Sequence, residues 1–258
     1  MTSEDWQADR QSVFERDAFT CQHCESTSVA AGSEGLRIHS VGPVPMVEDA
    51  VPPSVLVTVC DSCYEDLHDH QGAGQMTNET LFEFVRKLTR TQGEAIAIAA
   101  SFASLATSLP EAIAANEDTA YSASRREFLL VLDLVDAHLE RLAIADRDEL
   151  SDEVASSLEA FTEIADCSQA ELREVIDLVQ AVVAGLGRCH VCFEPVGAAY
   201  RCPTCGTAAL DISEWQQADG KTDFSGLYSA INDLLGGTSE TTEQLTTRTT
   251  ALAELLVE

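Results

Sequence analysis

The sequence predicts a mainly α-helical protein that carries two small zinc-binding β modules. Apolar residues recur at spacings of three and four through most of residues 78–185, which is typical of helices that pack on one another. Eight of the nine cysteines form Cys-x-x-Cys pairs, two before this stretch and two after it. Short β-type runs at residues 36–41 and 55–59 lie between the first two pairs.

These features divide the chain into four parts. Two amphipathic runs near the C-terminus meet at Gly236-Gly237, and this predicts a turn between two helices. The four parts are a first zinc module at residues 1–72, a helical bundle at 76–187, a zinc ribbon at 188–215 and a C-terminal helical hairpin at 222–258.

The first module begins with a short helix at residues 4–16, for which Ser3 is the expected N-cap. A Pro-rich loop joins the two β-type runs, and the second cysteine pair opens a further helix that contains His68. Gly72 and Gly74 end the module and form a linker.

Several signals predict helix boundaries within the bundle. Pro110 and the polar residues 116–124 separate one helical block from another at residues 128–142. Ser168 with Glu171 has the form of a capping box and predicts a helix start. We interpret the apolar stripes as the mutual core of the bundle rather than as a cofactor site.

The cysteine spacing predicts two structural zinc ions. Two residues between cysteines let one tight turn present both sulfurs to one tetrahedral ion, and two such turns complete a closed site. Disulfides or redox dithiols are the alternative, which the uniform spacing of all eight cysteines disfavours. Cys167 stands alone and is expected to be a small buried residue near a helix end. The predicted ligands are Cys21, Cys24, Cys60 and Cys63 for one ion and Cys189, Cys192, Cys202 and Cys205 for the other.

The chain is strongly acidic, with 44 Asp and Glu against 15 Lys and Arg and a formal net charge of −29. Because the acidic residues are spread along the chain, the composition resembles that of cytoplasmic proteins from halophilic archaea. A nucleic-acid mimic is the alternative, but it would concentrate the charge. In molar salt the Debye length falls to about 3 Å, so the acidity neither excludes nor supports a nucleic-acid partner.

We expect a soluble, cytoplasmic protein with no membrane partner. No secretory signal pattern opens the sequence. The uncharged stretch at residues 95–109 has 15 residues, whereas a membrane span needs about 20 apolar ones, so a buried helix is the better interpretation. Thiols in the cytoplasm stay reduced and available to metal.

The first module carries an ordered set of motifs. They are Val13-Phe-Glu-Arg-Asp-Ala-Phe-Thr-Cys-Gln-His-Cys24, Leu36-Arg-Ile-His-Ser-Val-Gly-Pro43 and Leu56-Val-Thr-Val-Cys-Asp-Ser-Cys63. In this order they resemble the HNH endonuclease family, over residues 10–70 or about a quarter of the chain. The resemblance implies a ββα-metal fold with a four-cysteine structural zinc. It also implies a separate catalytic Mg, Mn or Zn ion that polarises the scissile phosphate beside a histidine that activates water.

The catalytic residues depart from the family pattern. His39 matches the metal ligand of the hairpin, but Ser40 stands where the family has its general-base histidine, and serine is no base near neutral pH. Tyr64 stands where a histidine follows the last cysteine, and Glu25 where a glycine often follows the first pair. His68 lies one helical turn after Tyr64. His39 and His68 are therefore candidate catalytic residues for the additional divalent metal. The alternative is a hydrogen-bonding role for His39 in the hairpin and an exposed position for His68.

The second zinc segment has the layout of a zinc ribbon. Nine residues separate Cys189-His-Val-Cys192 from Cys202-Pro-Thr-Cys205, enough for a short hairpin between two facing turns. Gly206 suits the positive φ that such turns require. Arg188 and Arg201 are the only local cations, so no surface that stacks on single-stranded nucleic acid is visible.

Three functions are consistent with these observations. The first is an HNH-family zinc-binding protein that contacts DNA, another nucleic acid or a nucleoprotein assembly, with cleavage weak or lost. The second is a zinc-stabilised helical scaffold that meets a protein partner through its C-terminal helices. The third is an active metal-dependent HNH endonuclease with an altered site. We rank them in this order because the cysteines match the family while the catalytic residues do not.

Overall fold

The computed structural model describes residues 3–27, 34–42, 51–68, 76–115, 117, 119–196 and 200–257. The linker predicted at Gly72 and Gly74 lies outside this part of the chain. The described residues are mainly helical, as predicted. The elements are α1 (Ser3–Arg16), β1 (Leu36–Ser40), the 3-10 turn η1 (Pro53–Val55), β2 (Leu56–Cys60), α2 (Asp61–His68), α3 (Asn78–Ala115), α4 (Tyr121–Ala143), α5 (Asp152–Gly185), the 3-10 turn η2 (Ser213–Trp215) and α6 (Phe224–Val257).

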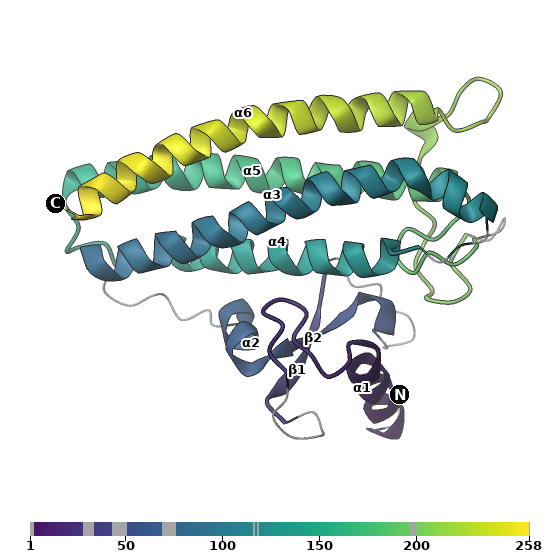
Figure 1. The fold of residues 1–258 in the computed structure, drawn as a ribbon, viewed down its shortest axis with the longest axis horizontal. Helices are drawn as coiled ribbons and strands as arrows, with labels where there is room; N and C mark the ends of the chain where they lie inside the picture. The colour runs from purple at the N-terminus through teal and green to yellow at the C-terminus, as the bar shows by residue number, and fades with distance from the viewer. Residues whose placement is uncertain are drawn as a thin grey trace.

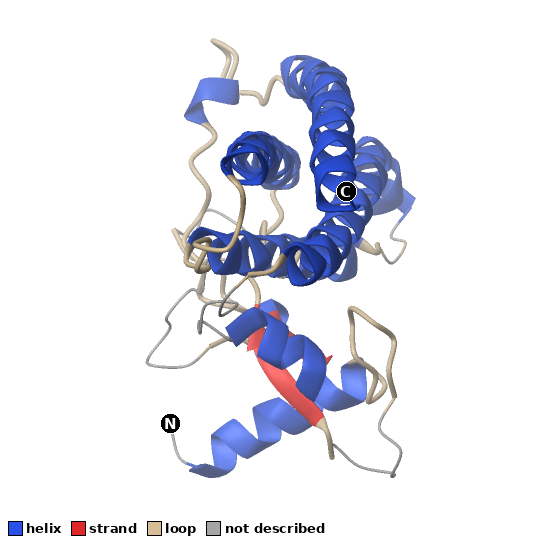
Figure 2. Ribbon diagram, turned by 90° about the vertical axis from the view of Figure 1, so that its left-hand side faces the viewer, coloured by secondary structure: helices blue, strands red, loops and turns tan. Residues whose placement is uncertain are grey.

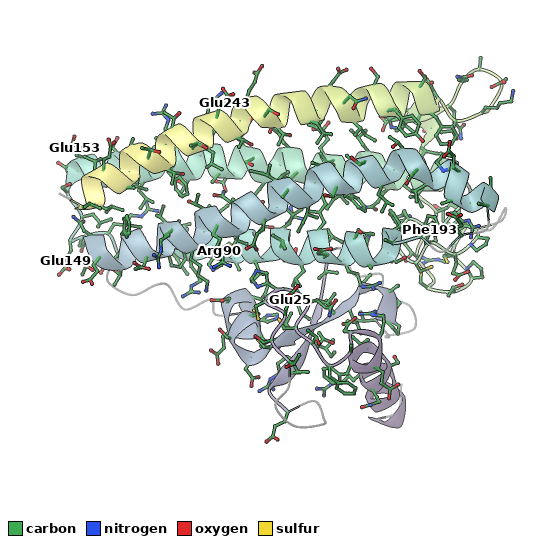
Figure 3. All side chains as sticks on the ribbon, in the orientation of Figure 1. Glu25, Arg90, Glu149, Glu153, Phe193 and Glu243 are labelled. Carbon is green, nitrogen blue, oxygen red and sulfur yellow. The ribbon has the colours of Figure 1, made fainter. Side chains whose placement is uncertain are left out.

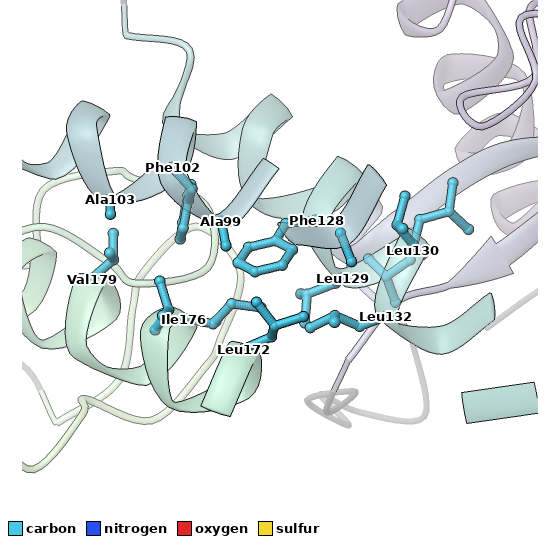
Figure 4. Close-up of a cluster of buried hydrophobic side chains, with 14 of the residues drawn as sticks. Ala99, Phe102, Ala103, Phe128, Leu129, Leu130, Leu132, Leu172, Ile176 and Val179 are labelled. Carbon is cyan, nitrogen blue, oxygen red and sulfur yellow. The ribbon is translucent and has the colours of Figure 1, made fainter. Parts of the chain in front are cut away.

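Helices α3, α4, α5 and α6 lie side by side and form one bundle (Figure 1). Figure 4 shows Phe102 of α3 and Phe128 of α4 close to Leu172 and Ile176 of α5. The rings of Phe102 and Phe128 meet edge to face, with their centroids 5.8 Å apart. The apolar stripes are therefore the mutual core of a helix bundle, as the sequence predicts.

The first zinc module lies against one side of the bundle, next to α4 (Figures 1 and 2). Strands β1 and β2 pair antiparallel, and His39 lies opposite Val57 in their register. Val57 and Val59 are buried in the same hydrophobic cluster as Leu129 of α4. The hairpin thus contributes to the bundle core rather than standing apart from it.

The Arg-Asp pair that precedes the first cysteines holds α1 on the hairpin. A guanidinium N–H of Arg16 donates to the Leu56 carbonyl at 2.6 Å, and a carboxylate oxygen of Asp17 accepts the backbone N–H of Thr58 at 2.9 Å. Asp17 is buried and also pairs with Arg16. Both motif residues therefore have a structural role here.

The second zinc module covers the end of the bundle, where α4 begins and α5 ends (Figure 3, near Phe193). Its described residues form isolated β-bridges but no strand, and residues 197–199 between the two turns are not described. The Tyr121 hydroxyl of α4 donates to the His190 carbonyl at 2.7 Å. Val55 of the first module is buried among the second module's cysteines, so the two modules meet.

The predicted C-terminal hairpin at residues 222–258 is wrong, because α6 is one continuous helix through Gly236 and Gly237. Glycine in a helix interior costs about 1 kcal/mol relative to alanine, whereas burial of each large apolar side chain contributes about 1.5–3 kcal/mol. The buried face along α5 and α3 continues on both sides of the glycines, which explains the single helix. Its buried residues are Leu227, Ile231, Thr238, Thr241, Leu245, Leu252 and Leu256.

Two predicted boundaries inside the bundle also differ. Ser168 is buried within α5, and the helix begins after Ser151, whose side chain accepts a backbone N–H of the first turn. Pro110 lies inside α3 and deprives the Ala106 carbonyl of its usual intrahelical donor. The Tyr228 hydroxyl of α6 approaches this carbonyl at 3.5 Å. Tertiary contacts thus compensate for the helix-breaking residue.

Helix α3 is long and apolar enough, by length and composition alone, to cross a membrane. It extends well beyond the uncharged stretch at residues 95–109. Core helices of globular proteins pass the same test, and Phe102 and Leu109 of α3 are buried in the bundle. One face of the stretch therefore contributes to the core, although only 28% of the apolar window is buried.

Candidate metal centres

The first cysteine cluster joins two local structures. Cys21 and Cys24 lie in a tight turn after α1, in which the Glu25 N–H donates to the Cys21 carbonyl at 3.0 Å. Cys60 ends β2, and Cys63 lies in the first turn of α2. The Sγ atoms of Cys24 and Cys60 are 3.6 Å apart. The fold therefore brings the first four predicted ligands together.

The second cluster consists of two turns of the kind that holds Cys21 and Cys24. The Phe193 N–H donates to the Cys189 carbonyl and the Gly206 N–H to the Cys202 carbonyl, both at 2.9 Å. The residue that closes each turn is left-handed, with φ of +65° at Phe193 and +69° at Gly206. This confirms the positive φ predicted for Gly206. Glu25 has φ of +58° at the same place in the first cluster.

Both clusters fit a tetrahedral zinc ion. In each cluster the four Sγ atoms lie within 4.8 Å of one another. Zn–S bonds of about 2.3 Å place tetrahedral sulfurs about 3.8 Å apart. The sulfurs of Cys189 and Cys205 are 3.5 Å apart, as are those of Cys192 and Cys202. All nine cysteines are described, and all are free thiols. The two ligand sets are therefore compatible with the two structural zinc ions predicted.

Hydrogen bonds between thiols separate the pKa values within each cluster, because they raise the pKa of Cys63 and Cys192 and lower the pKa of their partners. The hydrogen bond with Cys63 lowers the pKa of Cys21 to about 4 against the opposing effect of burial, and the hydrogen bond with Cys192 does the same for Cys189. Thiolate is the form that binds metal. Cys167, which the sequence predicted to be buried, is exposed on α5, because its helical position faces away from the bundle.

The structure brings the two candidate catalytic histidines together. His39 Nδ1 and His68 Nε2 are 3.2 Å apart. The ring of Tyr64 lies on the same side of α2, with its centroid 4.2 Å from that of His68. His68 is exposed, whereas only 10% of the His39 side chain is accessible. The hairpin and the helix thus face each other as the HNH resemblance implies.

Asp133 of α4 closes this histidine pair from the bundle side. Its Oδ2 lies 3.4 Å from His39 Nε2 and accepts the Gly42 N–H at 3.4 Å, and its Oδ1 is 3.7 Å from the Arg173 guanidinium. His39 therefore faces His68 with one ring nitrogen and Asp133 with the other, so one ion cannot bind all three through these atoms. Within the described part of the chain, only the cysteine clusters gather three or more ligand atoms around one point.

His23 belongs to the first cysteine cluster rather than to the histidine pair. Its Nδ1 is 3.3 Å from the Sγ of Cys63, and its Nε2 is 3.5 Å from a carboxylate oxygen of Glu94 on α3. His23 thus links the cluster to the bundle. His70 lies outside the described residues.

An open hollow of about 930 Å³ lies over the first turns of α3. Arg86, Lys87 and Arg90 line it beside Phe84, together with Glu79 and Glu83. Each of these cations has a carboxylate partner. The pairs are Arg86 with Glu83 at 2.7 Å, Lys87 with Asp66 at 2.6 Å and Arg90 with Glu94 at 3.4 Å.

The sequence analysis did not identify three residues of α4 that lie next to the zinc modules, namely Tyr121, Arg125 and Asp133. Arg125 is 2% exposed and Tyr121 is fully buried. Charged residues on an otherwise apolar helical face are a usable signal, and Asp133 interrupts the apolar run at residues 128–135. Such a pattern identifies Asp133 as unusual, but it does not predict which zinc module the residue contacts.

A scan against protein-family models finds no match to this chain, and searches of curated proteins and of solved structures find none either. The resemblance of residues 10–70 to the HNH family therefore rests on the order of the motifs.

Proposed function

We propose that this protein is an HNH-like zinc protein that acts by binding and has lost cleavage activity. One observation carries the proposal, namely that both ring nitrogens of His39 already have partners, His68 at Nδ1 and Asp133 of the bundle at Nε2. The zinc-binding part of the proposal rests on the two cysteine clusters.

The chemistry of cleavage supports this reading. An HNH-type reaction needs a metal that polarises a phosphate and a base that activates water. The Asp133 carboxylate repels a phosphate, His39 is nearly inaccessible, and Ser40 replaces the base. Loss of a general base alone costs a factor of about 10² to 10⁴ in rate.

Nucleic acid is the first candidate partner, and the hollow over α3 favours it. Arg86 and Arg90 are largely exposed, with 70% and 84% of their side chains accessible. In molar salt, distant carboxylates are screened within about 3 Å, so these local cations and the Phe84 ring decide the contact. Such a surface would hold a phosphate backbone rather than read its sequence.

A cleavage assay tests the catalytic part of the proposal. Supercoiled DNA is incubated with the zinc-loaded protein in about 2 M KCl, with magnesium, manganese or added zinc. We expect no nicking above that of a Cys21→Ser, Cys202→Ser double variant. Efficient nicking by the unaltered protein, abolished by His39→Ala or His68→Ala, would overturn the proposal in favour of an active endonuclease.

A binding assay tests the partner. Fluorescence anisotropy of a short DNA duplex should rise with the unaltered protein in high salt and fall by about tenfold in affinity for Arg86→Glu with Arg90→Glu, since two phosphate contacts are lost. Arg248→Glu on α6 is the control, because it makes the same Arg-to-Glu change, with half the total charge difference, at another exposed site. Absence of DNA binding would exclude the nucleic-acid partner and favour the scaffold function instead.

A zinc-stabilised scaffold is the second candidate, and the end of α6 favours it. Val257 is 73% exposed beside Ala253, over a hollow shared with Thr249 and Thr250. We take a second copy of this chain as the partner that pairs along this face. Sedimentation velocity should then report a dimer that Ala253→Glu dissociates, and a monomeric unaltered protein would exclude this candidate.

A halophilic cytoplasmic setting is part of the same proposal. The net charge of −29 and the reduced cysteines support it. Self-repulsion among the carboxylates destabilises the compact state, and salt screens it. The melting temperature should therefore rise between about 0.1 and 2 M KCl; a flat or falling melting temperature would contradict this setting.

A further inference from the structure

Arg125 of α4 is a buried cation without a carboxylate. It is 2% exposed, and its Nε and Nη1 atoms have no hydrogen-bond partner. Among the described residues, no Asp or Glu oxygen lies within ion-pair distance of its guanidinium. Removing a charge from water costs several kcal/mol unless an opposite charge offsets it. Some other group near Arg125 must therefore supply negative charge.

The position of Arg125 identifies the neighbouring group. Tyr121, one helical turn earlier, donates its hydroxyl proton to the carbonyl of His190, which lies between the ligands Cys189 and Cys192. Arg125 itself lines a hollow of about 470 Å³ together with His190 and Thr207. One face of α4 thus lies under both cysteine turns of the second module.

Charge and burial make the second cluster the appropriate counterpart. A zinc ion with four thiolates carries a net charge of −2. Three of the second module's ligands are at most 5% exposed, so water screens this charge poorly; they are Cys189, Cys202 and Cys205. Burial lowers the pKa of Arg125, and Tyr121, followed by Cys189 and Cys205, acts in the opposite direction.

The first cluster provides the contrast. Its ligand Cys24 is exposed to water, and its close polar neighbours are Ser26, which bonds to Cys24, and His23, which bonds to Cys63. Arg125 is the one arginine in the described part of the chain that is buried. A buried cation thus accompanies the cluster that water reaches least.

We propose that Arg125 is the counter-charge of the second zinc centre, so that zinc binding and closure of this end of the bundle stabilise each other. Zinc removal leaves the guanidinium buried without a negative partner, and removal of the guanidinium leaves the four thiolates less stable as ligands. The effect is reciprocal, because one coupling free energy governs both changes.

The test compares zinc release by the unaltered full chain and by full-chain variants in which Arg125 is substituted. Zinc release is measured against increasing chelator, by elemental analysis of the retained metal. The unaltered protein should retain two zinc ions, and Arg125→Met should release one of them at about tenfold lower chelator concentration, or more. Arg126→Met, the neighbouring half-buried arginine on the same helix, is the matched control and should leave both ions in place.

Thermal unfolding supplies the second readout. Chelation should lower the melting temperature of the unaltered protein more than that of Arg125→Met, since the metal-free variant has no uncompensated buried charge. Arg125→Lys keeps the charge and should keep both ions even if Arg125→Met folds poorly.

Three results would overturn the proposal. The first is equal zinc retention by Arg125→Met and the unaltered protein, and the second is equal loss of zinc by Arg125→Lys and Arg125→Met. The third is a rise in melting temperature of the zinc-loaded protein with inorganic phosphate that Arg125→Met abolishes, because the hollow would then hold an anion as the counter-charge.

Discussion

The two zinc modules use the same cysteine spacing, yet the bundle places different side chains beside them. Carboxylates of the bundle contact the histidines of the first module, Asp133 at His39 and Glu94 at His23, while Lys87 and Arg141 pair with Asp66 of its helix α2. The bundle presents a buried cation and a phenol to the second module, through Arg125 and Tyr121. The same ligand pattern therefore lies in two different environments, one in which carboxylates contact histidines and one in which a buried cation lies near the thiolates.

Their places in the fold differ as well. The first module lies on the side of the bundle and has a hairpin and helices of its own, whereas the second has two turns and closes the bundle end (Figure 1). The ring of Phe193 contacts the buried Tyr121, with centroids 5.2 Å apart. Damage to the second module should therefore spread into the bundle further than damage to the first.

The largest effects are expected from the cysteines. Cys21→Ser and Cys202→Ser should each lower the zinc content from two ions to one, as measured by elemental analysis. Structural zinc contributes about 10–16 kcal/mol in isolated zinc-finger peptides, so each change should cost several kcal/mol of unfolding free energy. Cys202→Ser should cost more, because it also exposes the charge of Arg125. Helicity by circular dichroism during denaturant unfolding provides the measurement.

Cys167→Ser is the matched control, because this exposed thiol belongs to neither cluster. It should leave two ions and an unchanged stability. An equal loss of stability from Cys21→Ser and Cys202→Ser would break the comparison between the modules.

A smaller effect on stability is expected from protonation of His138. This buried residue of α4 lies near the contact of α2, α3 and α4 that supports the first module. Asp66 of α2 there pairs with Lys87 and Arg141. Burial, and then the charge of Lys87, lowers the pKa of His138 to about 4. The unfolded chain, with a histidine pKa of about 6.5, binds a proton that the folded chain does not. The unfolding free energy of the protein should therefore fall as the pH drops from about 6.5 toward 4, by up to about 3 kcal/mol.

The measurement is denaturant unfolding of the zinc-loaded protein across this pH range, compared with His138→Gln, which does not titrate. Acid also protonates the thiolates, but this affects both proteins, so the difference between them reports His138. Parallel pH curves for the two proteins would exclude this origin. Phe84 packs edge-on against His138 in either case.

The smallest effects on stability are expected at the residues with left-handed backbone conformation in two of the cysteine turns. Glu25 is exposed and non-glycine at φ of +58°, so Glu25→Gly should relieve strain and raise the unfolding free energy by about 1 kcal/mol. Phe193 has the same backbone conformation, but its ring packs on Tyr121. Phe193→Gly should therefore lower the unfolding free energy, by about 1 kcal/mol. Thermal melts of both variants test the pair, and the same sign for both would contradict the assigned contacts.

Local pattern was sufficient for several features of the fold and the site. The Cys-x-x-Cys spacing predicted both ligand sets, because a tight turn is specified by residues adjacent in the sequence. The pairing of His39 with His68 followed from the hairpin-and-helix order of the HNH resemblance. The apolar stripes predicted a bundle core for the same reason, since helical periodicity is local. Two predictions that rested on a single local signal were wrong, the turn at Gly236-Gly237 and the helix start at Ser168. At both positions packing of the buried helix face outweighed the local preference.

The sequence by itself thus determined the helical class and the two four-cysteine sites. Only the tertiary structure decided that α6 is continuous, that Asp133 closes the histidine pair and that Arg125 lies under the second module. The physical reason is sequence distance. His39 and Asp133 are 94 positions apart, and no local preference specifies which helix face will meet which module. Packing of the whole chain makes that choice, because it buries the largest apolar area and then pairs the charges that remain inside.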